Sequence, residues 1–70
     1  MSIGEDRVRT KFNPSANGVV DQIKQKTAEL IDLCEGCRSV DTPTEAMRLL
    51  SLAQTSYEEA AMWAVKAATA

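Results

Sequence analysis

Apolar and small residues in the first half of the chain recur at alternating spacings of three and four. These positions are Val20, Ile23, Thr27, Leu30, Cys34 and Cys37. The spacing places the side chains on one face of a helix and is typical of an a/d seam about three heptads long. Val19 and Ile31 widen this stripe, and Leu33 adds one more apolar position. We predict a helix over about residues 17–38, with Asn17 as its N-cap residue.

A second seam follows the segment Thr42-Pro43-Thr44-Glu45. This segment has the pattern of a capping box, with Thr42 at the N-cap, Pro43 at the first helical position and Glu45 at the third. The seam positions are Ala46, Leu50, Ala53, Tyr57, Ala60, Ala64 and Ala67, with Leu49, Ala61 and Trp63 beside them. We predict a second helix over about residues 43–69, whose Ala-rich seam allows another backbone to approach closely.

The segment between the two predicted helices, Ser39-Val40-Asp41, is short, so the helices should be antiparallel neighbours. Residues 1–15 form a polar arm that ends at Asn13-Pro14-Ser15, and a short helix is possible at Glu5–Thr10. No segment has a strand pattern. The sequence therefore predicts one all-α domain over residues 1–70, a helical hairpin with a short N-terminal element.

The chain has 70 residues, and a domain of this size has a small core with marginal stability. With two Cys and no His, one chain cannot form a disulfide framework or a closed four-ligand zinc site. We therefore expect the chain to gain stability by associating with copies of itself.

Charge is distributed unevenly along the chain, although the net charge is only −2. Residues 1–26 hold five basic groups against three acidic ones, and residues 27–70 hold three against seven. Such a protein is poorly suited to bind DNA without sequence specificity, because that affinity comes from many contacts with phosphates. Its basic end can still bind a compact anion.

Two hydrophobicity signals bear on where the protein is found. The longest apolar run, Ala60–Val65, is far shorter than the ~20 residues of a membrane-spanning helix. The first residues contain no apolar core of a secretory signal. We expect a cytosolic protein that does not enter a membrane.

The pair Cys34 and Cys37 forms a CxxC motif, which elsewhere marks a redox centre or half of a zinc site. Here both residues fall on the predicted seam, and free Cys packs as a small apolar residue. The core interpretation is therefore favoured. A metal site shared between copies of the chain is the alternative.

No catalytic group of side chains is visible. Glu58 and Glu59 are adjacent on a predicted helix and point about 100° apart, so they do not form a shared carboxylate site. The absence of His removes the usual base for a Ser or Cys nucleophile. Tyr57 and Trp63 are interpreted as anchors of the core or of a subunit interface.

The segment Arg7-Val-Arg-Thr-Lys-Phe-Asn13 places cations on alternate positions before the only Phe of the chain. Phe12 is suited to stack on a nucleobase, while Lys and Arg pair with phosphate. Lys24 and Lys26 lie close to the N-terminus of the first long helix, whose free N–H groups also favour anions. From the chemistry of the segment alone, the favoured interpretation is a soluble basic arm whose Phe12 packs against the hairpin.

Three blocks of the sequence resemble the phage anti-CBASS protein 2 family, which shares a helical-hairpin domain with Thoeris anti-defence sponges. The blocks are Phe12-Asn-Pro-Ser15; Val20-Asp-Gln-Ile-Lys24 with Ala28-Glu-Leu-Ile-Asp32; and Leu52-Ala-Gln-Thr55 with Glu58-Glu-Ala-Ala-Met-Trp-Ala-Val-Lys66. They span about three-quarters of the chain between them, and the Ala-rich third block is the most specific.

The resemblance implies a homohexamer, without cofactor, metal or enzymatic activity, in the cytoplasm of an infected bacterial host. It would sequester cyclic di- and trinucleotides intact, such as cyclic GMP-AMP and cyclic tri-AMP, and so keep immune effectors inactive. The residues implied for the cyclic dinucleotide are Phe12, Lys24, Lys26, Arg9 and Lys11. Those implied for the cyclic trinucleotide are Asn13, Thr27 and Arg48.

Two other functions remain open from the residues alone. The chain is suited to be an oligomeric helical adaptor that binds a host protein through its basic arm. A nucleic-acid accessory protein is the weaker option, because residues 1–26 hold only five basic groups and would need to be displayed on several copies.

Overall fold

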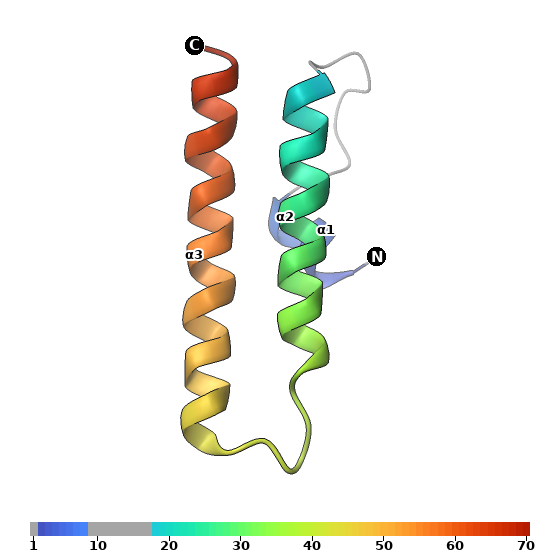
Figure 1. Ribbon diagram of the computed structural model, residues 1–70, viewed down its shortest axis with the longest axis vertical. Coiled ribbons are helices and arrows are strands. Elements are labelled where there is room, and N and C mark those ends of the chain that lie inside the picture. Colours follow the sequence, from blue (N-terminus) through green and yellow to red (C-terminus); the bar gives the residue numbers. More distant parts are fainter. Residues whose placement is uncertain (1, 9–17) are drawn as a thin grey trace.

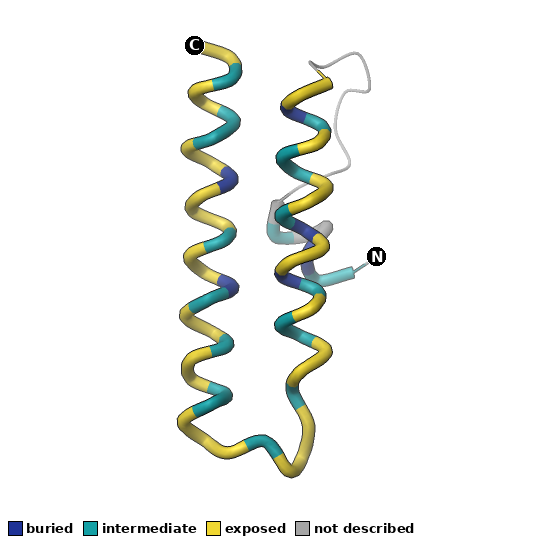
Figure 2. The backbone as a smooth tube through the Cα atoms, viewed as in Figure 1, coloured by how far each residue is buried: buried dark blue, intermediate teal, exposed yellow. Residues whose placement is uncertain are grey.

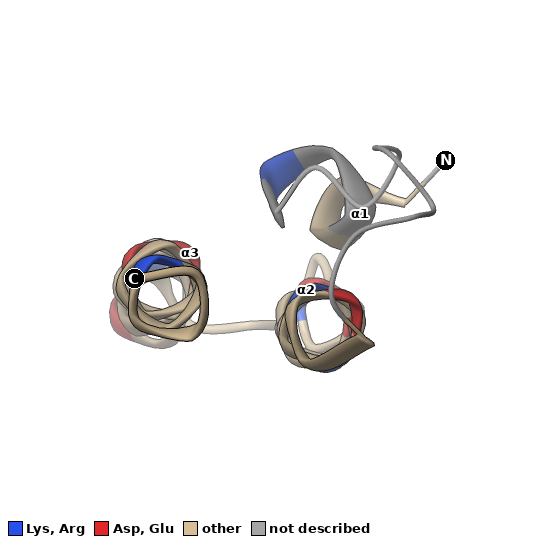
Figure 3. Cartoon of the chain, turned by 90° about the horizontal axis from the view of Figure 1, so that it is seen from above, with Lys and Arg blue, Asp and Glu red and all other residues tan. Residues whose placement is uncertain are grey.

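The structure is a computed structural model that describes residues 2–8 and 18–70. It contains a short helix α1 (Ile3–Val8) and two long helices, α2 (Gly18–Gly36) and α3 (Thr44–Ala68). α2 and α3 run antiparallel side by side, and α1 lies against α2 on one face of this pair (Figures 1 and 3). The predicted all-helical hairpin is confirmed, and the described residues contain no strand. No described helix has the combination of length and hydropathy needed to cross a membrane.

The start of α3 differs from the predicted capping box. Pro43 is the N-cap residue, the Met47 N–H donates to its carbonyl at 3.0 Å, and no side chain caps the helix. The Thr42 hydroxyl serves the connector instead, where it accepts from the Ser39 N–H at 2.9 Å and donates to the Cys37 carbonyl at 3.1 Å. The predicted N-cap residue was therefore wrong by one position, because Thr42 satisfies the end of α2 instead.

The apolar core lies between the three helices and is thin (Figure 2). Ala28 and Ile31 of α2 and Ala61 of α3 are its buried centre, and Ile3, Ile23 and Tyr57 pack around them. Val20 is buried nearer the start of α2. Since two of the three central residues are Ala, the core contains few large apolar side chains.

The buried stripes lie to one side of the predicted seams. On α2 Ile31 is fully buried, whereas Leu30 is 40% exposed and Cys37 is also exposed. On α3 Ala61 is buried, whereas Ala60 and Ala67 are exposed. A strict 3.5-residue repeat drifts around a helix of 3.6 residues per turn. α1 also packs beside Ala28, which moves the buried stripe of α2 toward that side.

This displacement corrects the core interpretation of Cys37 and leaves only the subunit-interface alternative for Trp63. Cys37 is not a core residue of the chain; its thiol lies on the surface, 3.4 Å from the Leu33 carbonyl oxygen, while Cys34 is half-buried. Trp63 is 57% exposed, so within one chain it does not anchor the core, whereas Tyr57 does pack against it.

A buried polar network, missed by the apolar pattern, joins α2 to α3 through Gln54. The Gln54 side chain is fully buried, and its amide donates to the Ile31 carbonyl at 3.1 Å and to Glu35 Oε1 at 3.0 Å. Its oxygen accepts from Arg38 Nη2 at 2.6 Å, and Arg38 also pairs with Glu35 at 3.1 Å. Across residues 2–8 and 18–70, no buried side-chain nitrogen or oxygen lacks a hydrogen-bond partner.

Gln54→Ala should destabilise the hairpin by about 2 kcal/mol or more, because it removes buried packing and leaves polar partners of Gln54 unsatisfied. Gln22→Ala is the matched control, since Gln22 is exposed on α2 and its loss should cost less than about 0.5 kcal/mol. Urea unfolding followed by circular dichroism, at one protein concentration, measures both. Equal costs for the two variants would show that Gln54 does not join the helices.

Acid should weaken the same network. The Gln54 hydrogen bond lowers the pKa of Glu35 below its ordinary 4.5, partial burial opposes the shift, and Arg38 lowers it further. A carboxylate with a lowered folded-state pKa stabilises the fold above pH 4.5, and this contribution is lost as the pH falls through the lowered pKa. Glu35→Gln should therefore flatten the fall of unfolding free energy below pH 4.5. Glu45, whose pKa Arg48 also holds low, should sustain the remaining slope. An unchanged slope in Glu35→Gln would refute the assignment.

Candidate functional site

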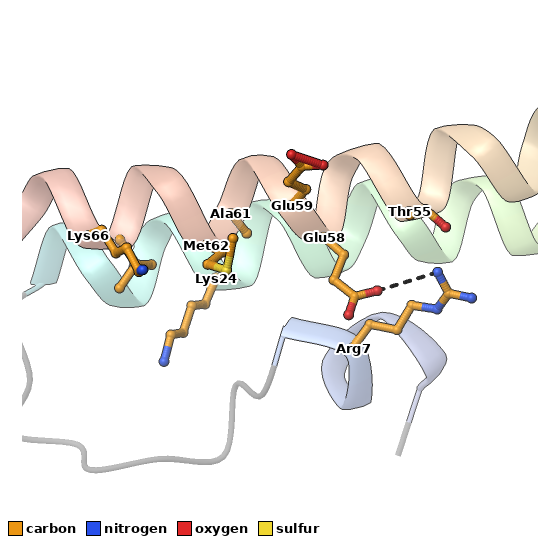
Figure 4. Close-up of a pocket in the computed structure, with 9 residues that line it drawn as sticks. Arg7, Lys24, Thr55, Glu58, Glu59, Ala61, Met62 and Lys66 are labelled. Carbon is orange, nitrogen blue, oxygen red and sulfur yellow. Dashed lines mark ion pairs between the residues drawn. The ribbon is translucent and has the colours of Figure 1, made fainter.

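A cleft of about 640 Å³ lies on the side of the hairpin that α1 partly covers (Figure 4). All three helices contribute to its lining, which consists of Arg7, Lys24, Thr55, Glu58, Glu59, Ala61, Met62, Val65 and Lys66. Three of these residues are cations, two are carboxylates, and the rest apart from Thr55 are apolar. The cleft therefore combines positive charge with apolar surface, in the size range of small-molecule sites.

α1 is held against α2 by a backbone contact that requires glycine. The Gly4 N–H donates to Asp32 Oδ1 at 2.7 Å. A Cβ atom at Gly4 would overlap the Ala28 carbonyl oxygen of α2, so a larger residue cannot take this place without a shift. Ile3 packs on the core beside it. These contacts place Arg7, one turn later, over α3.

The Arg7 guanidinium lies 3.6 Å from the Glu58 carboxylate, an ion pair that spans from α1 to α3. Figure 4 shows Glu58 directed toward Arg7, while the Glu59 carboxylate points away from it. Glu59 accepts from the Trp63 indole N–H at 3.4 Å. The two adjacent glutamates thus have different partners, as expected from their 100° separation on the helix.

Lys24 and Lys66 supply the other two cations. Lys24 is half-buried on α2 and lines the cleft. Lys66 is exposed on α3, with its ammonium 5.3 Å from the centre of the Trp63 ring, a cation–π distance. One cation therefore comes from each helix, and only the tertiary fold brings the three to one cleft.

Of the residues implied for the cyclic dinucleotide, the structure places Lys24 in the cleft. Lys26 is exposed and lies two residues, or about 200°, further around α2, so it is on another face. Arg9, Lys11 and Phe12 lie outside the described residues, as does Asn13 of the trinucleotide set. Their roles stay predictions.

The other two residues of the trinucleotide set are not brought together within the chain. Thr27 is half-buried on α2, and its hydroxyl donates to the Ile23 carbonyl at 2.6 Å. Arg48 is exposed at the connector end of α3, where it pairs with Glu45 at 2.6 Å. The hydrogen bond that Arg48 donates to the Glu45 carboxylate raises the pKa of Arg48.

Arg7, Glu58 and Lys66 were not among the binding residues predicted from the sequence. Arg7 had a signal, because it opens the basic cluster before Phe12. Nothing in the sequence places Lys66 near Lys24, since their proximity depends on the register of two antiparallel helices. Within the described part of the chain, no group of three or more His, Cys, Asp or Glu residues is placed to hold a metal ion.

The family model of the Acb2/Tad1 hairpin domain matches residues 3–69, a range that includes all three helices. Searches of curated proteins and of solved structures give no match.

Gly4→Ala should loosen α1 and move Arg7 from the cleft, because the new methyl group would overlap the Ala28 carbonyl oxygen. Gly36→Ala is the matched control, since a Cβ atom there meets no neighbour. Hydrogen exchange of the α1 amides should become faster in Gly4→Ala and stay at the wild-type rate in Gly36→Ala. Wild-type exchange in Gly4→Ala would contradict the close packing of α1 on α2.

Proposed function

The chain belongs to the Acb2/Tad1 hairpin-domain family, and we propose on this premise that it sequesters cyclic di- and trinucleotide immune messengers without cleaving them. The family consists of sponge-type binding proteins with an anti-defence role. Under the proposal, messenger held by the protein no longer reaches CBASS effectors, which stay inactive. The place of action is the cytoplasm of the infected bacterial host, where these messengers are made.

The observation that carries this proposal is the convergence of Arg7, Lys24 and Lys66 on one cleft. Cyclic dinucleotides combine two phosphates with two flat bases. Ammonium and guanidinium groups pair with the phosphates, and the apolar side chains of Ala61, Met62 and Val65 offer contact surface to a base. The cleft is thus suited to such a ligand in charge, in polarity and in size.

Phe12 is the proposed stacking residue, with Arg9 and Lys11 as neighbouring cations. Phe12 follows the last residue of α1, Val8, by four positions, a separation that spans ~14 Å at most in an extended chain. Since α1 borders the cleft, a ring at this position is within reach of a bound base. The proposal keeps Lys24 as the phosphate partner and sets Lys26 aside.

The chain has an apolar face that supports self-association, as the proposed homohexamer requires. Leu30 of α2 and Ala60 of α3 are exposed. Leu30 lies about 200° around α2 from Ala28, the residue against which α1 packs. No charged residue occurs along this face of α3, at positions 46, 49, 53, 56, 60, 64 and 67. We propose that a second copy covers it, because a face of small uncharged residues permits close helix packing. The trinucleotide site of Asn13, Thr27 and Arg48 would need several copies to complete it.

Lys24→Gln should weaken binding of cyclic GMP-AMP by about tenfold or more, because hydrogen bonds to charged groups contribute roughly 1.5–3 kcal/mol. Lys26→Gln is the matched control and should bind as the wild type does.

Phe12→Ala should lower the affinity for cyclic GMP-AMP about 5- to 150-fold, because the proposed stacking contact with a base is lost. Isothermal titration calorimetry measures all three. Equal losses in Lys24→Gln and Lys26→Gln would remove Lys24 from the site.

The fate of the ligand separates sequestration from catalysis. After incubation, the protein is denatured by heat and the released ligand is chromatographed; intact cyclic GMP-AMP is expected. Recovery of linear product would identify an enzyme. No heat with any cyclic di- or trinucleotide would reject the sponge and favour the host-protein adaptor.

A further inference from the structure

The cleft contains a feature that opposes anion binding: the carboxylate of Glu58 already pairs with one of its three cations. The Arg7–Glu58 pair lies where both side chains remain accessible, with 31% and 49% of their areas exposed. Exposed ion pairs add little to stability, with a median near 0–1 kcal/mol. The Arg7–Glu58 pair therefore contributes too little to folding stability to explain why position 58 carries a carboxylate.

We propose that Glu58 is an affinity-determining residue that competes with the ligand for Arg7. Before ligand binds, the Glu58 carboxylate pairs with the Arg7 guanidinium, and a bound phosphate then replaces the carboxylate as its partner. The inference rests on the proposed function, since it assigns the displacing group to the phosphate of the sequestered ligand. A carboxylate in this role raises the ligand concentration at which the cleft fills.

The geometry allows this exchange at low cost. At 3.6 Å the pair is longer than the 2.7–2.9 Å of a close charge-assisted hydrogen bond. The half-exposed Glu58 side chain has solvent to move into. α1 does not depend on the pair for its position, because the Gly4–Asp32 hydrogen bond and the packing of Ile3 hold it. Arg7 can therefore change partners while its helix stays in place.

Glu59 provides the comparison that isolates this effect. It carries the same charge, is the next residue of α3 and also lines the cleft. Its carboxylate points away from Arg7 in Figure 4 and accepts from Trp63 instead. Removing either charge makes the cleft equally more positive, but only the loss of Glu58 frees the guanidinium.

The test compares Glu58→Gln, Glu59→Gln, Arg7→Gln and the Arg7→Gln/Glu58→Gln double variant. Each is titrated with cyclic GMP-AMP and with inorganic pyrophosphate by calorimetry at low salt. Glu58→Gln should bind both ligands about fivefold more tightly than the wild type, and Glu59→Gln less than about twofold more tightly. In the Arg7→Gln background the gain from Glu58→Gln should vanish, since both changes act through one guanidinium.

Glu58→Asp is a second variant that keeps the charge and shortens the side chain. It should also tighten binding, because the shorter carboxylate reaches Arg7 less well, and it guards against a folding defect in Glu58→Gln. Equal gains in Glu58→Gln and Glu59→Gln would overturn the inference in favour of a general charge effect. Weaker binding in Glu58→Gln would overturn it as well, by making Glu58 a ligand contact.

The two ligands separate this inference from the proposed function. If pyrophosphate shows the expected order of affinities while cyclic GMP-AMP binds no variant, the exchange at Arg7 stands and the sponge is rejected. If cyclic GMP-AMP binds the wild type but Glu58→Gln matches Glu59→Gln, the sponge stands and the exchange is rejected. If neither ligand binds any variant, both are rejected.

Discussion

The hydrogen bond from the Gln54 amide to the Ile31 carbonyl oxygen sets the register of the two long helices, and the site depends on that register. The apolar core around it is thin and built largely from Ala, so sliding one helix along the other would change little apolar burial. The buried Gln54 amide opposes such sliding, because any shift of one helix along the other would leave its polar groups without hydrogen-bond partners. Seven residues back along α2 and seven forward along α3, the same register brings Lys24 opposite Ala61, where both line the cleft.

The second constraint is the absence of a side chain at Gly4. It lets the backbone of α1 approach the backbone of α2, and the Asp32 carboxylate then accepts from its N–H. Arg7 reaches α3 from this position. The register of α2 with α3 and the placement of α1 on α2 are thus independent contacts, and the three cations converge only when both are made.

The all-helical hairpin was predictable from the sequence because spacings of three and four persist through both long segments. Which face is buried was less predictable: Ala60, Ala61 and Ala64 are alike in size and polarity, and the deciding residue, Gln54, is polar. The capping box located the start of α3 but not its N-cap, since Thr42 bonds to Cys37 instead. Lys24 was predicted from its charge and from the resemblance of the chain to the family. Arg7, Glu58 and Lys66 form a site only through tertiary contacts.

The placement of α1 divides the hairpin into two faces with different chemistry. On the side that α1 covers, cations from three helices and two carboxylates surround the cleft. On the other face, positions 46, 49, 53, 56, 60, 64 and 67 of α3 carry no charged residue. A ligand that carries charge suits the first face, and a second copy of the chain suits the second. No residue that lines the cleft is among the uncharged α3 positions named for the other face, so affinity for the proposed messenger can be adjusted at Glu58 without altering the proposed contact between copies.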